Sequence, residues 1–244
     1  MSIVKCTLVS VGLLVAFGAA HAAPVNGTGN VTSDVIYGTG GNLNGSFTGE
    51  TAGNIEVGLR AHLRYPPSNI FNYDGVSTYS FANGGNPANR SIFNFDWAVN
   101  VNQSGAVGGA VLSDYDYRLS FDTDTTAAVA FTSIDPFNTA GYVDHSLGTN
   151  ATVGNTGVEF ASIGALQGAM SSYNIAQQSS NLGFGFSANP SASGIYDFRF
   201  EVLEKGTTNV LASSQIQVQV PVAPTLPLVL AALGLMGFVS RRKA

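Results

Sequence analysis

Four aspartates in one short stretch could supply oxygen ligands to a cation. Asp114, Asp116, Asp122 and Asp124 fall within eleven residues, and Asp116 and Asp122 share one face of a predicted strand. Calcium takes about six to eight oxygen ligands, often from loop carboxylates. The stretch lacks EF-hand spacing and a glutamate at the twelfth position. It therefore predicts either a weak calcium site at Asp116, Asp122 and Asp124 or a solvated acidic face.

A second group of residues has the chemistry of a sugar site. Its aromatic members are Tyr65, Phe71, Tyr73 and Tyr79, and Asn69 and Asn72 lie among them in a region rich in Pro, Asn and Gly. Sugars are bound by an aromatic platform together with a few polar side chains that donate and accept hydrogen bonds. The group is either such a platform or a set of rings that fill the inside of a loop.

The sequence gives little support to zinc binding or to catalysis. His62 and His145 stand alone, without the spacing of a zinc motif, and Cys6 is the only cysteine. No Gly-x-Ser-x-Gly elbow is present. We predict no enzymatic activity and no cofactor apart from the calcium alternative. A secreted hydrolase remains the other hypothesis, which a pocket with two carboxylates or a close Ser–His pair would favour.

The composition excludes several classes of protein. Charged residues make up 10% of the 244 residues and the formal net charge is −5, whereas a usual protein has about 25% charged residues. Disordered polyelectrolytes are poor in apolar residues, but 45% of this chain is hydrophobic. A nucleic-acid binder normally has a basic stripe, so nucleic acid is not an expected partner. Few Glu and Lys residues beside 29 Gly argue against a helical bundle.

Alternating apolar residues predict the elements that hold these candidates. Phe93, Phe95, Trp97, Val99 and Val101 share one face of a strand, as do Tyr115, Tyr117, Leu119 and Phe121 in the next. Strands over 195–202 and 215–220 flank 204–209 and form a predicted hairpin. Apolar spacing from Phe160 to Tyr173 predicts a short helix over the sheet edge. We predict one all-β, antiparallel β-sandwich or jelly-roll-like domain over residues 23–219.

The N-terminus has the three parts of a secretory signal peptide. Lys5 is followed by an apolar run from Leu8 to Ala20, and Ala20-His21-Ala22 supplies small residues for cleavage. We expect residues 1–22 to be removed between Ala22 and Ala23 by signal peptidase after passage through the secretion translocon. Cys6 would leave with this segment.

The C-terminus has a short proline motif, an apolar segment and a basic end. Pro221, Val222, Ala223 and Pro224 precede an uncharged run from Leu226 to Val239, and Arg241, Arg242 and Lys243 follow. Residues 220–240 are long enough as a helix to span a bilayer. We predict a terminal segment over 220–244 with a transmembrane helix at 226–240, whose basic end stays in the cytoplasm.

This order of parts resembles the PEP-CTERM type of sorting signal of exported proteins in Gram-negative bacteria. The resemblance covers residues 221–244 and departs from the family at the motif, which has no glutamate and looks closer to variants that begin Val-Pro-Leu-Pro-Ala. It implies recognition by exosortase, a membrane cysteine transpeptidase, while the precursor is held transiently in the inner membrane. It also implies a mature form at the cell surface or outside the cell, in association with exopolysaccharide. The alternative is a tail that is kept as a simple anchor.

Parts of the middle region also resemble the bodies of proteins with such tails. These segments are Arg60 to Pro66, Tyr73-Asp74-Gly75, Tyr115–Asp124, Gln177–Phe184 and Gly194–Asp197. The resemblance implies an extracellular β-domain and no particular activity. We therefore predict a structural or adhesive protein of the cell surface, matrix or biofilm, with a carbohydrate- or calcium-binding module as the first alternative.

Overall fold

The structure is a computed structural model that describes residues 25–26, 31, 34–38, 42–65, 68–122, 124–186, 189 and 192–221. The predicted signal peptide, the cleavage site at Ala22 and Ala23, and the predicted transmembrane helix at 226–240 lie outside these residues. So do Val222, Ala223, Pro224 and the basic end with Arg241, Arg242 and Lys243, whereas Pro221 is described and exposed. Within the described ranges, no helix has the length and apolar character needed to cross a bilayer.

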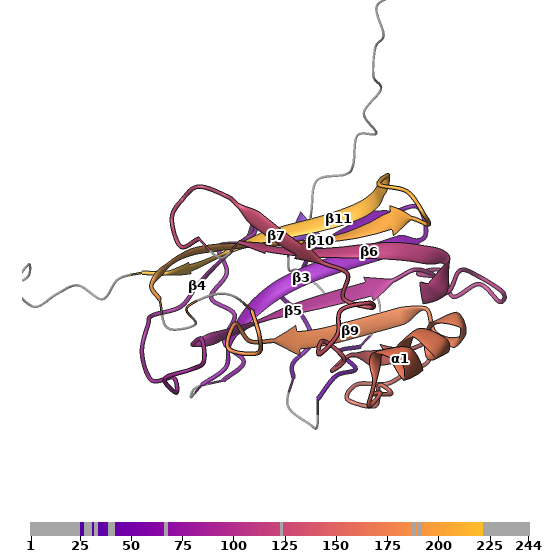
Figure 1. Ribbon diagram of the computed structural model, residues 1–244, viewed down its shortest axis with the longest axis horizontal. Helices are drawn as coiled ribbons and strands as arrows, with labels where there is room; N and C mark the ends of the chain where they lie inside the picture. Colours follow the sequence, from indigo (N-terminus) through magenta and orange to yellow (C-terminus); the bar gives the residue numbers. More distant parts are fainter. Residues whose placement is uncertain are drawn as a thin grey trace, which may run out of the picture.

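The described chain forms two β-sheets, which confirms the predicted all-β class (Figure 1). The six-stranded sheet has the order β1 (Val25–Asn26), β2 (Thr48–Ala52), β3 (Ile55–Leu63), β5 (Phe93–Asn100), β9 (Ile175–Ser180) and β8 (Ser146–Gly148). The five-stranded sheet has the order β4 (Thr78–Ser80), β11 (Val210–Val220), β10 (Gly194–Glu204), β6 (Tyr115–Asp122) and β7 (Phe131–Ile134). The pairing is antiparallel except between β4 and β11, which run parallel.

The core lies between the two sheets and is rich in aromatic rings. Phe95 of β5 stacks on Phe198 of β10 with ring centroids 4.3 Å apart, and Trp97 meets Phe200 at 5.0 Å. The inward residues predicted for the strands at 93–101, 196–202 and 216–220 are all buried. The predicted alternation therefore gave the correct inner face for β5, β10 and β11, because burying one face is what period two encodes.

The predicted hairpin is present. β10 and β11 pair antiparallel with Phe198 opposite Ile216, and the turn between them closes with a hydrogen bond from the Glu204 amide to the Asn209 carbonyl. Gly206 adopts a φ of 73° there, which favours glycine.

The helix is shorter than its predicted extent of Phe160 to Tyr173. α1 covers Ile163–Ala169 and continues as a 3₁₀ turn over Met170–Ser172. The Ser162 side chain caps its start by accepting a hydrogen bond from the Ala165 amide. Leu166 and Met170 are the members of its apolar face that are fully buried in the core.

The outer face of the six-stranded sheet is covered, although the alternation predicted only one buried face per strand. Every residue of β5 is buried. Val35, Tyr37 and Phe47 pack against Ala98 of β5 in a second, smaller core. We call residues 31–47, as far as they are described, the covering segment. The Gln177 side chain of β9 holds this segment, since it accepts from the Ile36 amide and donates to the Asp34 carbonyl. Because the covering residues are far away in sequence, the apolar alternation of β5 does not show that its outer face is buried.

Candidate functional site: a polar cleft on the six-stranded sheet

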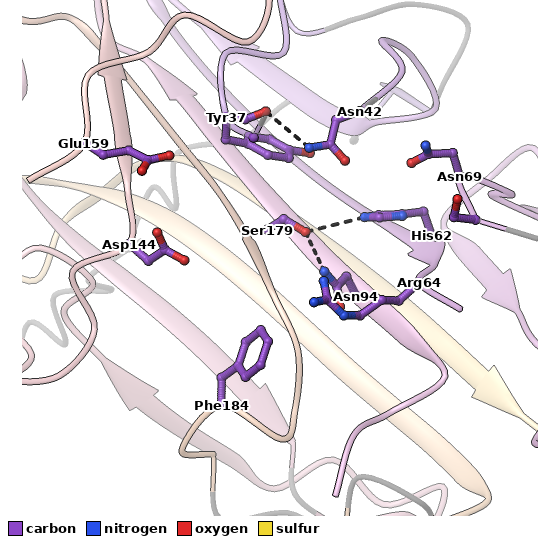
Figure 2. A pocket seen from close by; sticks show the side chains of 12 residues that line it. Tyr37, Asn42, His62, Arg64, Asn69, Asn94, Asp144, Glu159, Ser179 and Phe184 are labelled. Atoms are coloured by element: carbon purple, nitrogen blue, oxygen red, sulfur yellow. Dashed lines mark hydrogen bonds between the residues drawn. The ribbon is translucent and has the colours of Figure 1, made fainter. Parts of the chain in front are cut away.

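A cleft of about 430 Å³ opens on the outer face of the six-stranded sheet. Its floor is made by His62 of β3, Asn94 of β5 and Ser179 of β9, and Figure 2 shows these side chains meeting there. The walls come from the covering segment, from the loop after β3, and from loops around residues 144, 159 and 184. The volume is in the usual range for a small-molecule site, about 300–1,000 Å³.

Strand register brings the floor residues together. His62 pairs with Asn94 in the β3–β5 ladder, and Ser179 stands opposite Asp96 in the β5–β9 ladder. Asn94 donates from Nδ2 to Ser179 Oγ over 2.8 Å and accepts at Oδ1 from Asn181 Nδ2 over 2.9 Å. The floor is therefore held rigidly by the sheet and by side-chain hydrogen bonds.

Next to the floor lies a buried ionic network that ties the covering segment to the sheet. Arg60 Nε donates to Asp96 Oδ2 over 2.6 Å, and Arg60 Nη2 donates to the Tyr37 hydroxyl over 2.7 Å. The Tyr37 hydroxyl in turn donates to Asp96 Oδ2 over 2.5 Å. Arg60 also donates to the carbonyls of Leu43 and Gly45. The two charged side chains are at most 1% exposed, so each depends on the other for its charge.

The network controls the protonation of its members. Burial alone would raise the pKa of Asp96, but interaction with the neighbouring His62 ring and with the Arg60 guanidinium holds that pKa well below its usual range. Burial and the nearby Asp96 carboxylate raise the pKa of Tyr37 well above its usual value. Asp96 is therefore an anion and Tyr37 a neutral donor at any ordinary pH.

The histidine and serine of the floor do not form a catalytic triad. His62 Nε2 lies 3.2 Å from Asp96 Oδ1 and 3.4 Å from Ser179 Oγ, so the acid and the hydroxyl share one ring nitrogen. In a Ser–His–Asp triad the acid holds the opposite nitrogen. Here that nitrogen, Nδ1, faces the Leu63 carbonyl at 3.2 Å. The arrangement positions hydrogen-bonding groups and departs from the geometry of a Ser–His–Asp triad.

One rim of the cleft presents an aromatic ring flanked by two arginines. The Phe184 side chain is 43% exposed. The guanidinium of Arg90 lies 4.7 Å from its centroid and that of Arg64 lies 5.4 Å from it. Cation–π contacts of this kind orient the ring and keep it at the surface. Asn42 and Asn69 also line the cleft and add amide donors and acceptors.

The opposite wall carries two exposed acids, Asp144 and Glu159. Figure 2 shows them together, across the cleft from His62 and Arg64. Glu159 Oε1 accepts a long hydrogen bond of 3.5 Å from Ser146 Oγ. The cleft therefore has an acidic side and a basic side, with polar groups between them.

The predicted calcium ligands are not gathered in one place. Asp116 lies at the start of β6, where it binds Lys205 Nζ at 2.8 Å and the Gly206 amide at 2.7 Å. Asp122 lies six residues further, about 20 Å along the strand. It accepts from the amides of Asp124 and Ala130, which stabilises the turn after β6. Within the described ranges, no three His, Cys, Asp or Glu side chains are grouped as metal ligands. Calcium binding stays a prediction.

The predicted aromatic group fills a loop and does not form an exposed platform. Tyr79 is completely buried, and its hydroxyl donates to the Ser46 carbonyl. Tyr73 packs against Tyr79 with ring centroids 6.0 Å apart. Phe71 lies 4.9 Å from the Arg60 guanidinium, and Tyr65 packs on the core. Of the two interpretations the structure favours the packed cluster, although Asn69 does line the cleft.

The two histidines have different surroundings. His145 is fully buried among the rings of Trp97, Phe137 and Tyr142. Its Nε2 lies 2.7 Å from the Pro136 carbonyl, and burial lowers the pKa of the ring to about 4. His145 is thus a core residue, whereas His62 belongs to the cleft.

The sequence did not single out most of the cleft residues as a site. Arg64, Ser179 and Phe184 belong to segments noted only for their resemblance to other exported proteins. Asn94 is an outward residue of a strand for which the apolar pattern predicts only the inward face. Asp144 and Glu159 lie in loops without any motif.

Comparisons with known proteins do not place the chain in a family. No family model matches it, and no curated protein matches it. One solved structure with a detectable similarity is a family 123 glycoside hydrolase from Clostridium perfringens, described for glycolipid glycan hydrolysis. That alignment has 11% identity and a TM-score of 0.24, and it covers 68% of this chain and 28% of the hydrolase chain. A similarity at this level establishes neither a shared fold nor a shared activity.

Proposed function

We propose that this protein is exported, processed through its C-terminal sorting signal, and acts at the cell surface or in the extracellular matrix as an adhesive component that binds carbohydrate. The single observation that supports binding is the cleft, where an exposed ring, several amides and charged groups of both signs meet in one concavity. Sugars need this combination, because their rings have apolar faces and their hydroxyls both donate and accept. The sequence of the two ends supports export.

Carbohydrate binding is tested by a glycan array probed with the purified full chain and with Phe184→Ala. We expect the wild-type chain to retain glycans and Phe184→Ala to lose about tenfold or more in affinity, because the exposed ring supplies the apolar contact. Val107→Ala is the matched control, since Val107 is a fully exposed apolar residue outside the cleft. Equal retention by Phe184→Ala and Val107→Ala would place binding elsewhere.

Processing is tested by mass spectrometry of the protein isolated from the cells that produce it. We expect a mature N-terminus at Ala23 and a C-terminus near Pro221 to Pro224, with or without an added group. Replacing Arg241, Arg242 and Lys243 by alanine should cause the precursor to accumulate, because the basic end orients the tail. An intact C-terminus at Ala244 would make the tail an anchor and remove the sorting step.

One observation favours a second candidate, secreted glycoside hydrolysis: two carboxylates, Asp144 and Glu159, line the same cleft. Glycosidases use such a pair, but their general acid is normally desolvated, and both of these side chains are exposed. Release of new reducing ends from a retained glycan, abolished by Glu159→Gln, would support hydrolysis. Binding without release would support the adhesive role.

A further inference from the structure

Asp144 and Glu159 differ from the other acids of the protein. All fifteen Asp and Glu residues lie in the described ranges. Those outside the cleft hydrogen-bond or pair within the protein, as Asp74 does with three backbone amides and Asp116 does with Lys205. Within the described residues, Asp144 has no such partner, and Glu159 has only the 3.5 Å contact with Ser146. Among the described residues, these two carboxylates are thus the acids with the fewest internal bonds, and both line the cleft.

The net charge of the domain gives an independent indication of the charge of that ligand. The chain has 15 acids and 10 bases, and four of the bases (Lys5, Arg241, Arg242 and Lys243) lie in the predicted terminal signals. Removing them leaves 15 acids against 6 bases, a formal charge of −9. A field of this sign concentrates cations near the surface and repels anionic polymers. A uronate polymer is thus disfavoured on approach, and an amine-bearing polymer is favoured.

The remaining lining suits a sugar ring. Phe184 is 43% exposed beside the two guanidinium groups, and Asn42 and Asn69 offer amides that can bond hydroxyls. The Arg64 guanidinium lies 5.8 Å from the Tyr65 ring centroid and 5.4 Å from that of Phe184, and it supplies positive charge on the basic side of the cleft. An ammonium group would meet attraction on the acidic side and repulsion on the basic side, which fixes the orientation of the ring.

We propose, building on the proposed function, that the cleft binds a glycan whose sugars carry free amino groups. The sugar ring lies against Phe184, and the protonated amine lies at Asp144 and Glu159 as a charge-assisted hydrogen-bond donor. N-acetylation of the amine removes the charge and enlarges the group, and so it weakens binding. The degree of deacetylation of the surrounding polysaccharide would then set how strongly the protein adheres to it.

The test is isothermal titration calorimetry of the purified full chain with three hexasaccharides. One is built from glucosamine, one from N-acetylglucosamine and one from galacturonate. We expect the glucosamine oligomer to bind about tenfold or more tightly than the other two. Its affinity should fall as salt is added, because the two carboxylates are exposed and screened. Asp144→Asn with Glu159→Gln should reduce its affinity to that of the acetylated oligomer. Glu204→Gln, which changes an exposed acid in the β10–β11 turn, should have no effect.

The outcomes separate this inference from the proposed function on which it rests. Equal affinity for the amino and acetylated oligomers, or full binding by the double variant, would overturn the amine preference while leaving carbohydrate binding intact. Stronger binding of galacturonate would overturn it as well. Failure of all three oligomers, together with an empty glycan array, would overturn the proposed function itself.

Discussion

On the five-stranded sheet, the outward charges pair with one another near the surface. Arg118 Nε contacts Glu201 Oε2 at 2.6 Å; the Arg118 side chain is 33% exposed, whereas that of Glu201 is 6% exposed. On the six-stranded sheet, the corresponding pair of Arg60 and Asp96 is covered by a separate segment and is at most 1% exposed. Both faces alternate polar residues in the same way. The comparison teaches that the cover, and not the strand pattern, decides whether the arginine of such a pair is buried with its acid or stays partly exposed to water.

The largest expected difference in unfolding free energy is between the alanine variants of Arg60 and Arg118. Arg60→Ala should cost about 3–5 kcal/mol of unfolding free energy, because it leaves Asp96 buried without its partner. Arg118→Ala should cost less, about 1–2 kcal/mol, because Arg118 is partly exposed and the buried Glu201 keeps Arg199 at 3.6 Å. Urea denaturation of both variants measures the contrast. Similar small losses in the two variants would show that the covering segment does not depend on the Arg60–Asp96 pair.

The inner core provides the reference for this comparison. Phe198→Ala removes a completely buried ring and should cost about 3–5 kcal/mol. We expect it also to prevent export of soluble protein, because the loss is a large share of a typical domain's stability. Unchanged denaturation and secretion of Phe198→Ala would contradict the buried position of this ring.

The buried histidine of the inner core makes the stability of the protein depend on pH. The folded pKa of His145 is about 4, below the ordinary value of 6.5, so the unfolded chain binds the proton more readily. Stability from this group is therefore complete above about pH 6.5 and is lost as pH falls toward 4, by about 3 kcal/mol in total. His145→Gln keeps a donor for the Pro136 carbonyl and should flatten the curve in this window. Parallel curves for the two proteins would contradict the lowered pKa.

The outer network should respond in a different pH range. Asp96 has a lowered pKa, so its contribution is present above the ordinary carboxyl value and is lost only as pH falls below about 4. Stability of His145→Gln should thus be nearly constant from pH 6.5 to 4.5 and decrease in stronger acid. A decrease in the stability of His145→Gln between pH 6.5 and 4.5 would assign the titration in that range to a group other than His145.

The smallest effects are expected at the cleft. Asp144→Asn with Glu159→Gln should change the unfolding free energy by less than about 0.5 kcal/mol, because neither acid has a strong bond to another residue that the structure describes. Asp116→Asn should lose about 0.5–1 kcal/mol by weakening the contact with Lys205. A large loss in the double variant would mean that the cleft acids serve the fold and are not free for a ligand.

The sequence by itself determined the all-β class, the inner faces of the strands and the hairpin of β10 and β11. These features depend on near neighbours along the chain, since alternation sets a strand face and a short turn sets the pairing. It also located the helix, which begins after the Ser162 cap and ends before Tyr173, so that it is shorter than the apolar spacing.

Only the tertiary structure decided which polar residues form a site. Tyr37 reaches Asp96 from 59 residues away, and His62 meets Ser179 from 117 residues away. These contacts depend on the order of strands in the sheet, which puts β9 beside β5, and on the covering segment that packs on the outer face of the sheet. Alternation is a local property of each strand, whereas strand order is set by the packing of the whole chain. The cleft therefore had no local signal in the sequence.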